Sequence, residues 1–194
     1  AKVLSLLEHV QLPPTKRTEN GNYWVYNVYG GTQQKTLWIT ASFNLRVDGL
    51  LLNDNDELLI SDEREYGMQF TKFLGGGLEL GEGLVDGLKR EFMEECNLEI
   101  EVVGHFYTTD FFVKSAFNNS QVISVYYLVR SNTPVNLVTK TIQFDFYGEG
   151  EALQAFRWVN LTALSIADFT FPTDKRVVEL LQDELWALPN AILK

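Results

Sequence analysis

The sequence is poor in the residues that build several common kinds of site. Its 194 residues include one cysteine and two histidines. The single cysteine, Cys96, excludes a disulfide within this chain, and no set of cysteines and histidines is spaced for zinc. His9 and His105 give no compelling Ser-His-Asp triad, and we expect His105 to be structural. A lone cysteine favours a reducing compartment, so we predict a cytoplasmic location.

Positive charge is also scarce. The chain carries 16 Lys and Arg against 26 Asp and Glu, a formal net charge of −10 at pH 7. Broad binding to nucleic acid or to acidic membranes needs excess positive charge, so we expect neither partner. No stretch approaches the ~20 apolar residues of a membrane span, and residues 1–10 lack the apolar run of a signal peptide. An anionic substrate would need metal ions to offset local repulsion.

Apolar residues, by contrast, are plentiful. The chain is 45% hydrophobic and 13% aromatic, enough for one substantial core, so we predict a single α/β (α+β) domain at residues 42–194 with an N-terminal extension at residues 1–41. Pro172 opens an amphipathic helix with apolar residues at helical spacing, which we expect to reach Leu185. Alternating apolar runs between turn residues predict strands at Phe43–Leu52, Glu57–Ser61, Glu99–Thr108, Val122–Arg130 and Leu153–Asn160.

The N-terminal extension combines a short helix at Leu4–Val10 with an aromatic β-hairpin. The hairpin strands are Tyr23–Tyr29 and Leu37–Thr40, and Gly30 and Gly31 begin the turn. One interpretation is extra sheet packed on the domain. The other is a dimer surface or a pocket wall, where aromatic residues are enriched. Strand alternation puts apolar groups on both faces, which suggests a second partner, so we predict a homodimer.

The most informative segment is residues 75–98, GGGLELGEGLVDGLKREFMEECNL. At about 100° per residue, its helical part has one apolar stripe, consisting of Leu84, Val85, Leu88, Phe92 and Cys96. Glu91, Glu94 and Glu95 converge in a neighbouring arc, because positions three and four apart are neighbours on a helix. Such close carboxylates suit a cation, and oxygen-only ligation suits Mg²⁺ or Mn²⁺. The alternative is an ordinary Glu-rich, solvated helix face.

The spacing of this segment resembles the Nudix box, the signature of the Nudix hydrolase superfamily. The matching positions span residues 76–98 and are Gly76, Glu82, Arg90, Glu91, Phe92, Glu94, Glu95 and Leu98. Asn97 stands where the family usually has Gly, at a helix end that needs a left-handed backbone, which Asn tolerates. Leu74 stands where many relatives have Pro. Neither departure touches the expected metal ligands.

The resemblance implies a Nudix fold, an α/β/α sandwich around a mixed β-sheet, over roughly residues 42–188. It also implies Mg²⁺- or Mn²⁺-dependent hydrolysis of the pyrophosphate bond of a nucleoside diphosphate linked to another moiety: a nucleotide-sugar, a dinucleotide or a modified nucleotide. Glu91, Glu94 and Glu95 would hold the metal, with the Gly75 carbonyl completing the shell. Arg90 would pair with a box glutamate and fix its rotamer.

Other acidic residues have supporting or alternative roles in this scheme. Glu79 and Glu82 would support the loop and the helix start. Nudix hydrolases often take a further glutamate from a later loop as metal ligand or general base. The loop Asp145–Glu151 offers two candidates, Glu149, which we favour, and Glu151. The alternative, at least as good for either residue, is that this segment is a plain solvated loop. The expected catalytic residues are therefore Arg90, Glu91, Glu94, Glu95 and Glu149.

The loop Asp110–Gln121 is the candidate substrate-binding segment. It carries Phe111, Phe112, Lys114 and Phe117, which can stack on a base or sugar and meet a phosphate; alternatively, the phenylalanines belong to the core. A second functional class is a non-catalytic Nudix-like module that senses a nucleotide. Such modules usually lose the box glutamates, which are all present here. An isoprenoid diphosphate isomerase would need a cysteine in an early strand, but Cys96 lies in the box helix.

Overall fold

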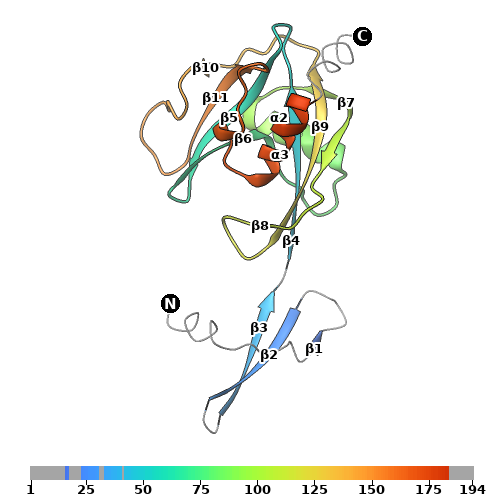
Figure 1. The fold of residues 1–194 in the computed structure, drawn as a ribbon, viewed down its shortest axis with the longest axis vertical. Coiled ribbons are helices and arrows are strands. Elements are labelled where there is room, and N and C mark those ends of the chain that lie inside the picture. The colour runs from blue at the N-terminus through green and yellow to red at the C-terminus, as the bar shows by residue number, and fades with distance from the viewer. Residues whose placement is uncertain (1–15, 18–22, 31–32, 41, 184–194) are drawn as a thin grey trace.

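The computed structural model describes residues 16–17, 23–30, 33–40 and 42–183, with side chains described from residue 42 onward. The expected helix at Leu4–Val10 and residue Leu185 lie outside these ranges. The aromatic hairpin is confirmed: β2 (Tyr23–Gly30) pairs antiparallel with β3 (Gln33–Thr40). With the two-residue β1 (Lys16–Arg17) they form a three-stranded sheet of their own (Figure 1).

The second sheet has eight strands in the order β10-β11-β5-β6-β4-β9-β7, and β8 pairs with β9 at its side. It is mixed, because β4 runs parallel to β9 and β10 parallel to β11, while the other pairs are antiparallel. Its strands are β4 (Phe43–Leu51), β5 (Glu57–Glu65), β6 (Met68–Gly77), β7 (Ile100–Thr108), β8 (Val113–Lys114), β9 (Gln121–Ser131), β10 (Thr139–Lys140) and β11 (Leu153–Asn160).

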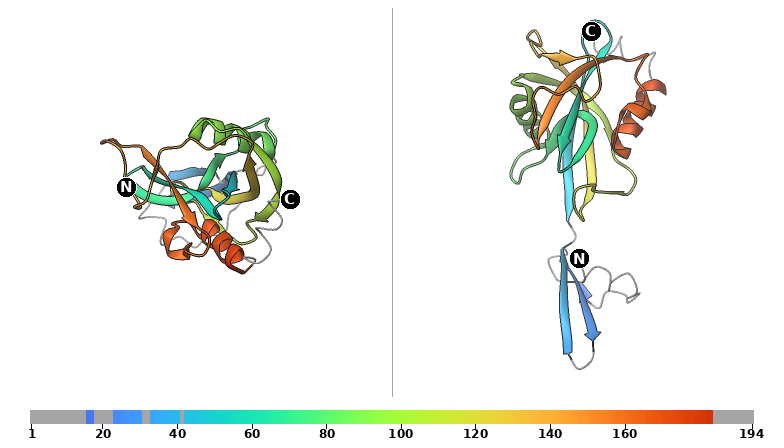
Figure 2. Two further views of the ribbon diagram at one scale, coloured as in Figure 1. Left: turned by 90° about the horizontal axis from the view of Figure 1, so that it is seen from above. Right: turned by 90° about the vertical axis from the view of Figure 1, so that its left-hand side faces the viewer.

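Two helices cover opposite faces of this sheet, so the expected α/β/α sandwich is confirmed (Figure 2). The helix α2 (Leu84–Cys96) packs through Leu88 and Phe92 on one apolar cluster, and α3 (Pro172–Asp183) packs through Val177 and Leu181 on the other. A short 3₁₀ helix, η1 (Ile166–Asp168), precedes α3. None of the helices in the described part of the chain is long and apolar enough to cross a membrane.

The expected stripe of α2 is only partly correct. Leu88 and Phe92 are fully buried, but Val85 is 38% exposed because it lies at the edge of the stripe, in the first turn. Cys96 is half-buried, and burial, reinforced by the charge of Glu95, raises the pKa of its thiol to about 12. Asn97 ends the helix with φ 51° and ψ 43°, the left-handed conformation expected for it.

Two strands differ from the expectation, and both differences place residues at the site. β5 continues past Ser61 to Glu65, through the charged run Asp62-Glu63-Arg64-Glu65. β6 begins at Met68, well before the glycines, although the sequence pattern indicated only a strand end there. Charged residues and glycines are depleted in strands, so local propensity favours neither extension. The β5–β6 ladder, from Ile60↔Phe73 to Glu65↔Met68, supplies the hydrogen bonds that outweigh that preference.

Candidate active site

The end of β6 brings a box carboxylate against the backbone. A Cβ on Gly76 would lie 2.3 Å from the carboxylate carbon of Glu91, and a Cβ on Gly75 would lie 2.1 Å from the carbonyl oxygen of Val47. Both distances are far below normal contact. Gly75 also has φ +136°, which L side chains rarely adopt. These two glycines are therefore needed so that β4, β6 and the Glu91 side chain can approach one another.

Arg90 binds three of the acidic side chains of the box, those of Glu82, Glu91 and Glu94. It binds Glu82 through two bonds, Nε to Oε2 at 3.1 Å and Nη2 to Oε1 at 2.7 Å. Its Nη1 donates to Glu91 at 2.9 Å and to Glu94 at 3.0 Å, and its Nη2 also donates to the Gly77 carbonyl. The expected pairing of Arg90 with a box glutamate is thus present. Hydrogen bonding to Arg90 lowers the pKa of Glu82.

The ion pair of Arg90 and Glu82 also holds the loop before α2. The backbone N–H of Glu79 donates to Glu82 Oε1 at 2.6 Å, while the Glu79 side chain is exposed. Gly87 is buried, and a Cβ there would meet Glu82 and Leu78 at 2.8 Å. Glu82 therefore has the supporting position expected for it, and the lack of a side chain at Gly87 lets this loop pack closely on α2.

Lys72, on β6, is a site residue that the sequence pattern did not indicate. Its ammonium lies 2.8 Å from the Gly75 carbonyl oxygen, 2.8 Å from Glu95 Oε1 and 3.0 Å from Glu63 Oε1. Burial lowers the pKa of Lys72, but the charges of Glu95 and Glu63 outweigh burial and raise it. Burial raises the pKa of Glu95, and the charge of Lys72 offsets only part of this rise. The Gly75 N–H donates to the other oxygen of Glu95 at 3.1 Å.

These acidic residues share one cavity of about 380 Å³, here called the glutamate cavity. Five glutamates line it: Glu63, Glu65, Glu91, Glu94 and Glu95. Two come from β5 and were missed, because strand alternation places Glu63 and Glu65 on one face only if β5 extends beyond Ser61. The signal available in the sequence was the charged run that directly follows the apolar residues Leu58–Ile60.

The donor set of the glutamate cavity fits a hard divalent cation, since it offers carboxylate and carbonyl oxygens without nitrogen or sulfur ligands. As the side chains stand, no three acidic, His or Cys groups of the described residues are placed to hold one ion. The reason is their pairing: Arg90 holds Glu91 and Glu94, and Lys72 holds Glu95 and Glu63. The residue types nevertheless fit Mg²⁺ or Mn²⁺.

A second cavity of about 300 Å³ adjoins the first, because Glu63 and Glu65 line both. We call it the aromatic pocket. Four aromatic rings line it, with that of Phe117 in the middle. The Phe117 ring centroid lies 5.6 Å from the centroids of Tyr66 and Phe70 and 5.9 Å from that of Phe171. Three cationic side chains also line it: Arg46, Lys72 and Lys114. Aromatic rings and cations together suit the base and the phosphates of a nucleotide.

Of the four expected substrate-binding residues, the structure brings two to the aromatic pocket. Lys114 and Phe117 line it. Phe111 and Phe112 line neither cavity and are 40% and 72% exposed, so they belong neither to the core nor to this pocket. The short strand β8, paired with β9, separates Phe111 and Phe112 from Phe117 along the chain.

Two buried acids also line the aromatic pocket. Asp174, at the start of α3, accepts a hydrogen bond from the Tyr126 hydroxyl at 2.7 Å. Burial and the charge of Asp48 raise the pKa of Asp174 to about 7. Arg46 donates to Asp48 Oδ1 and to the Gly75 carbonyl, both at 3.1 Å, while Asp48 Oδ2 is buried with no partner among the described residues. These acids make this part of the pocket polar beneath its aromatic wall.

The candidate base loop lies outside both cavities. Glu149 and Glu151 are exposed, line neither cavity and make no hydrogen bond or ion pair with another residue of the described ranges. A catalytic role for Glu149 therefore stays a prediction. His105 is exposed and lines neither cavity, with Nε2 2.8 Å from Thr108 Oγ1 and its ring edge-on to Tyr127, so its structural role stays a prediction.

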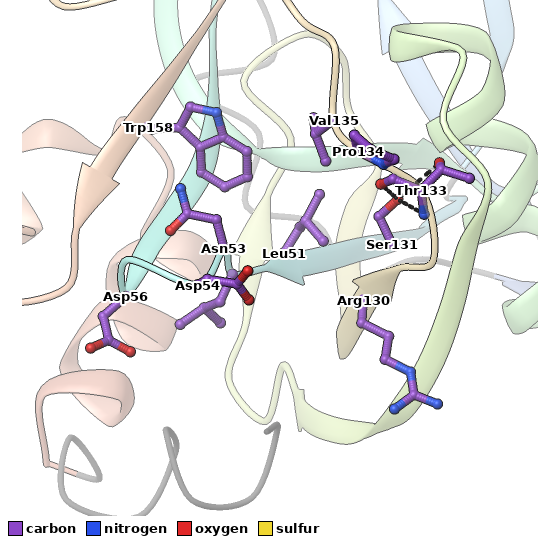
Figure 3. A pocket seen from close by; sticks show the side chains of 11 residues that line it. Leu51, Asn53, Asp54, Asp56, Arg130, Ser131, Thr133, Pro134, Val135 and Trp158 are labelled. Carbon is purple, nitrogen blue, oxygen red and sulfur yellow. Dashed lines mark hydrogen bonds between the residues drawn. The ribbon is translucent and has the colours of Figure 1, made fainter. Parts of the chain in front are cut away.

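A third cavity, of about 410 Å³, lies at the other end of β4 (Figure 3). Leu51, Asn53, Asp54 and Trp158 are among its lining residues, together with Arg130, whose guanidinium lies away from the Trp158 ring. None of the site residues expected from the sequence lines it. It is the largest of the three cavities but lacks the convergent carboxylates of the glutamate cavity.

Several solved structures of other proteins have a similar fold. A NUDIX hydrolase from Nitrosomonas europaea has a similar fold, with a TM-score of 0.54 and 16% identity over 72% of this chain and 88% of its own. A MutT NUDIX hydrolase from Burkholderia pseudomallei gives a TM-score of 0.55 and 16% identity over 71% and 97%. The ORF135 protein of E. coli gives 0.54 and 18% over 77% and 95%.

No curated protein matches the sequence closely enough to count as a relative. The model of the NUDIX domain family, however, matches residues 42–181. That range includes the whole of the box, α2, every strand of the eight-stranded sheet and all but the last two residues of α3. The chain therefore belongs to the NUDIX domain family, the Nudix hydrolases.

Proposed function

We propose that this protein hydrolyses the pyrophosphate bond of a nucleoside diphosphate linked to another moiety, in a reaction that depends on Mg²⁺ or Mn²⁺. The observation that carries the proposal is the junction of two cavities through Glu63 and Glu65. One cavity gathers five glutamates, and the other has aromatic rings and three cationic side chains. A nucleotide in the aromatic pocket would direct its phosphates toward the glutamate cavity. The pyrophosphate bond that links it to the second moiety would then lie beside the five glutamates.

The residues divide into ligands and supports in this proposal. Glu91, Glu94, Glu95 and the Gly75 carbonyl would hold the divalent ion, which would neutralise the diphosphate and lower the pKa of a bound water. Arg90 keeps Glu91 and Glu94 beside the Gly77 backbone. Lys114 faces the phosphates, and Phe117 provides a surface for the base or sugar.

The general base is the role with two candidates. Glu149 is the candidate from the later loop, which would have to move because the residue is exposed and outside the cavity. Glu65 already lines both cavities, and no cation of the described residues pairs with it. Rates of Glu149→Gln and Glu65→Gln would assign the role, since loss of a general base lowers turnover by about 10²–10⁴-fold. Two unaffected variants would return the base to the box glutamates.

The decisive test is hydrolysis by the purified protein with Mg²⁺ against nucleotide-sugars, dinucleotides and modified nucleotides. Glu95→Gln and Glu94→Gln should each lower turnover of the best substrate by about a hundredfold or more with the fold intact, because each removes a charge from the ion's shell. Glu99→Gln is the matched control, an exposed glutamate just after α2 that lines neither cavity. Binding of a nucleotide without any turnover would instead favour the non-catalytic nucleotide-sensing module.

We further propose that residues 1–41 form an extension that takes part in a homodimer. The pairing of β2 and β3 supports this, because they belong to a small sheet separate from the main one, and a small isolated ribbon of strands is only marginally stable in water. Light scattering at micromolar concentration tests it, and a mass near 22.2 kDa would contradict it. We also propose a cytoplasmic location, which the single cysteine supports; fractionation of cells that express the protein tests it.

A further inference from the structure

Lys72 connects the two cavities of the proposed site. Its side chain lines the aromatic pocket. Its ammonium, however, contacts Glu95 and Glu63, which line the glutamate cavity. The third contact is the Gly75 carbonyl oxygen at 2.8 Å. Lys72 is also buried, so these contacts are made away from bulk water.

Two of the three contacts, to the Gly75 carbonyl and to Glu95, are hydrogen bonds, and the third, to Glu63, is an ion pair. An ammonium group carries three N–H donors and no acceptor, and the structure gives it three oxygens within 3.0 Å. Two of the three oxygens, on Gly75 and Glu95, belong to the proposed metal shell. A divalent ion and an ammonium cannot share the same oxygens at such distances, because like charges repel strongly in a poorly solvated site. Binding of the divalent ion to these two oxygens therefore requires the Lys72 ammonium to leave them.

We propose that Lys72 is a built-in cation that competes with the divalent ion for the Gly75 carbonyl and Glu95, and that its displaced ammonium turns to the phosphates of a nucleotide in the aromatic pocket. The inference rests on the proposed function for the identity of the two ligands. Without metal, Lys72 keeps Glu95 and Glu63 from being buried carboxylates without a counter-charge. With metal, the same side chain becomes available to the substrate.

The chemistry of lysine fits both positions. Its ammonium is a compact charge on a flexible four-carbon stem, so it can change partners without movement of β6. Arg46, the other cation at Gly75, is tied to Asp48 as well, and its fork is held by that second contact. Lys114 lines the pocket from β8 and makes no hydrogen bond or ion pair with Glu95 or Gly75. Lys72 is thus a positioning residue placed to couple metal binding to phosphate binding.

The test measures two affinities with Lys72→Gln and Lys72→Met. Mn²⁺ binding to the full chain is followed by the electron paramagnetic resonance signal of free Mn²⁺. Binding of α,β-methylene-ADP, which has no hydrolysable pyrophosphate bond, is then measured at saturating Mn²⁺. We expect Mn²⁺ to bind about tenfold tighter or more to either variant, and the nucleotide analogue to bind about tenfold weaker. A residue with only a structural role would not move the two affinities in opposite directions.

Lys114→Gln is the matched control. It should weaken the analogue without raising Mn²⁺ affinity, because Lys114 does not contact the metal ligands. Unchanged or weaker Mn²⁺ binding in folded Lys72 variants would overturn the competition. Tighter Mn²⁺ binding together with unchanged analogue binding would overturn the proposal that the displaced Lys72 ammonium turns to the phosphates.

If both Lys72 variants fail to fold, the wild-type protein decides the question: the Lys72 Nζ resonance should shift on titration with Mg²⁺, and an unmoved resonance overturns the proposal. Neither readout needs hydrolysis. Absence of turnover on every nucleotide would therefore contradict the proposed function alone.

Discussion

Asp62 and Glu63 are neighbours on β5, yet they belong to two very different regions. Asp62 is fully buried and both of its oxygens are used, by the Arg157 guanidinium, the Thr71 hydroxyl and the Phe144 N–H. Glu63 lies on the opposite face, pairs with Lys72 at 3.0 Å, and keeps 15% of its side chain exposed to the two cavities. Two neighbouring residues of one strand therefore belong to different kinds of ion pair. The Asp62–Arg157 pair is closed, meaning that it is buried within the protein, and the Glu63–Lys72 pair is open, meaning that it lines the cavities.

The difference shows how structural charge is distinguished from charge available to a ligand. The Asp62–Arg157 pair joins β5 to β11 and has no face left for a ligand. The group formed by Glu63, Lys72 and Glu95 lines cavities, and its cation is shared among three oxygens. A buried charge whose lone pairs are all satisfied by the protein stabilises one arrangement. A partly exposed group with exchangeable partners suits a site.

The largest expected effect comes from breaking the closed pair. Asp62→Asn keeps the shape of the side chain but leaves the guanidinium of Arg157, a residue only 8% exposed, without a counter-charge. We expect the free energy of unfolding to fall by about 3–5 kcal/mol. Urea denaturation followed by circular dichroism measures this loss. A change below about 1 kcal/mol would mean that the pair is not the closed structural element described here.

A buried acid without a cationic hydrogen-bond partner provides the next test. The pKa of Asp174 is raised from 3.8 to about 7, so between these values the folded state holds a proton that the unfolded state has lost. Stability from Asp174 is therefore present at low pH and is lost as pH rises through about 7. Asp174→Asn cannot ionise and retains an acceptor for the Tyr126 hydroxyl.

We expect the stability of Asp174→Asn relative to wild type to increase by about 3 kcal/mol between pH 4 and pH 8. Urea midpoints at a series of pH values provide the measurement. Parallel curves for the two proteins would show that Asp174 ionises normally in the folded state.

The open group should tolerate the corresponding change much better. In Glu63→Gln, Lys72 still contacts Glu95 and the Gly75 carbonyl, so no buried charge is left alone. We expect the free energy of unfolding to fall by only about 1 kcal/mol, measured by the same urea denaturation. A loss as large as that of Asp62→Asn would remove the distinction between the two regions.

The smallest effect is expected at the exposed pair of Arg130 and Glu101, which serves as the reference. Arg130 donates to Glu101 Oε2 at 2.8 and 3.0 Å, but both side chains are nearly half exposed. Water and salt screen such pairs, so Glu101→Gln should leave the melting temperature unchanged within error. Differential scanning fluorimetry is sufficient for this test. A clear drop would show that short distances alone, without burial, stabilise this fold.

The parts of the fold that were predicted correctly are those with strong local patterns. β11 agrees at both ends with the strand predicted from its alternation, and α3 begins at Pro172 as expected. The β2–β3 hairpin was recognisable from its glycines and aromatic runs. The C-terminal end of β5 and the start of β6 were not, because their charged residues and glycines favour loops locally. Hydrogen bonds to neighbouring strands decide those boundaries, and such partners are distant in the sequence.

For the site, the sequence by itself determined the box: the spacing of Glu91, Glu94 and Glu95 follows from helical periodicity, and so does the reach of Arg90 to Glu94. Only the tertiary structure decided that Glu63 and Lys72 join them, that Phe117 lines a pocket and that Phe112 does not. The physical reason is the range of each interaction. Contacts within one helix depend on a local repeat, whereas contacts between β5, β6 and α2 depend on how the sheet pairs and which face the helix covers.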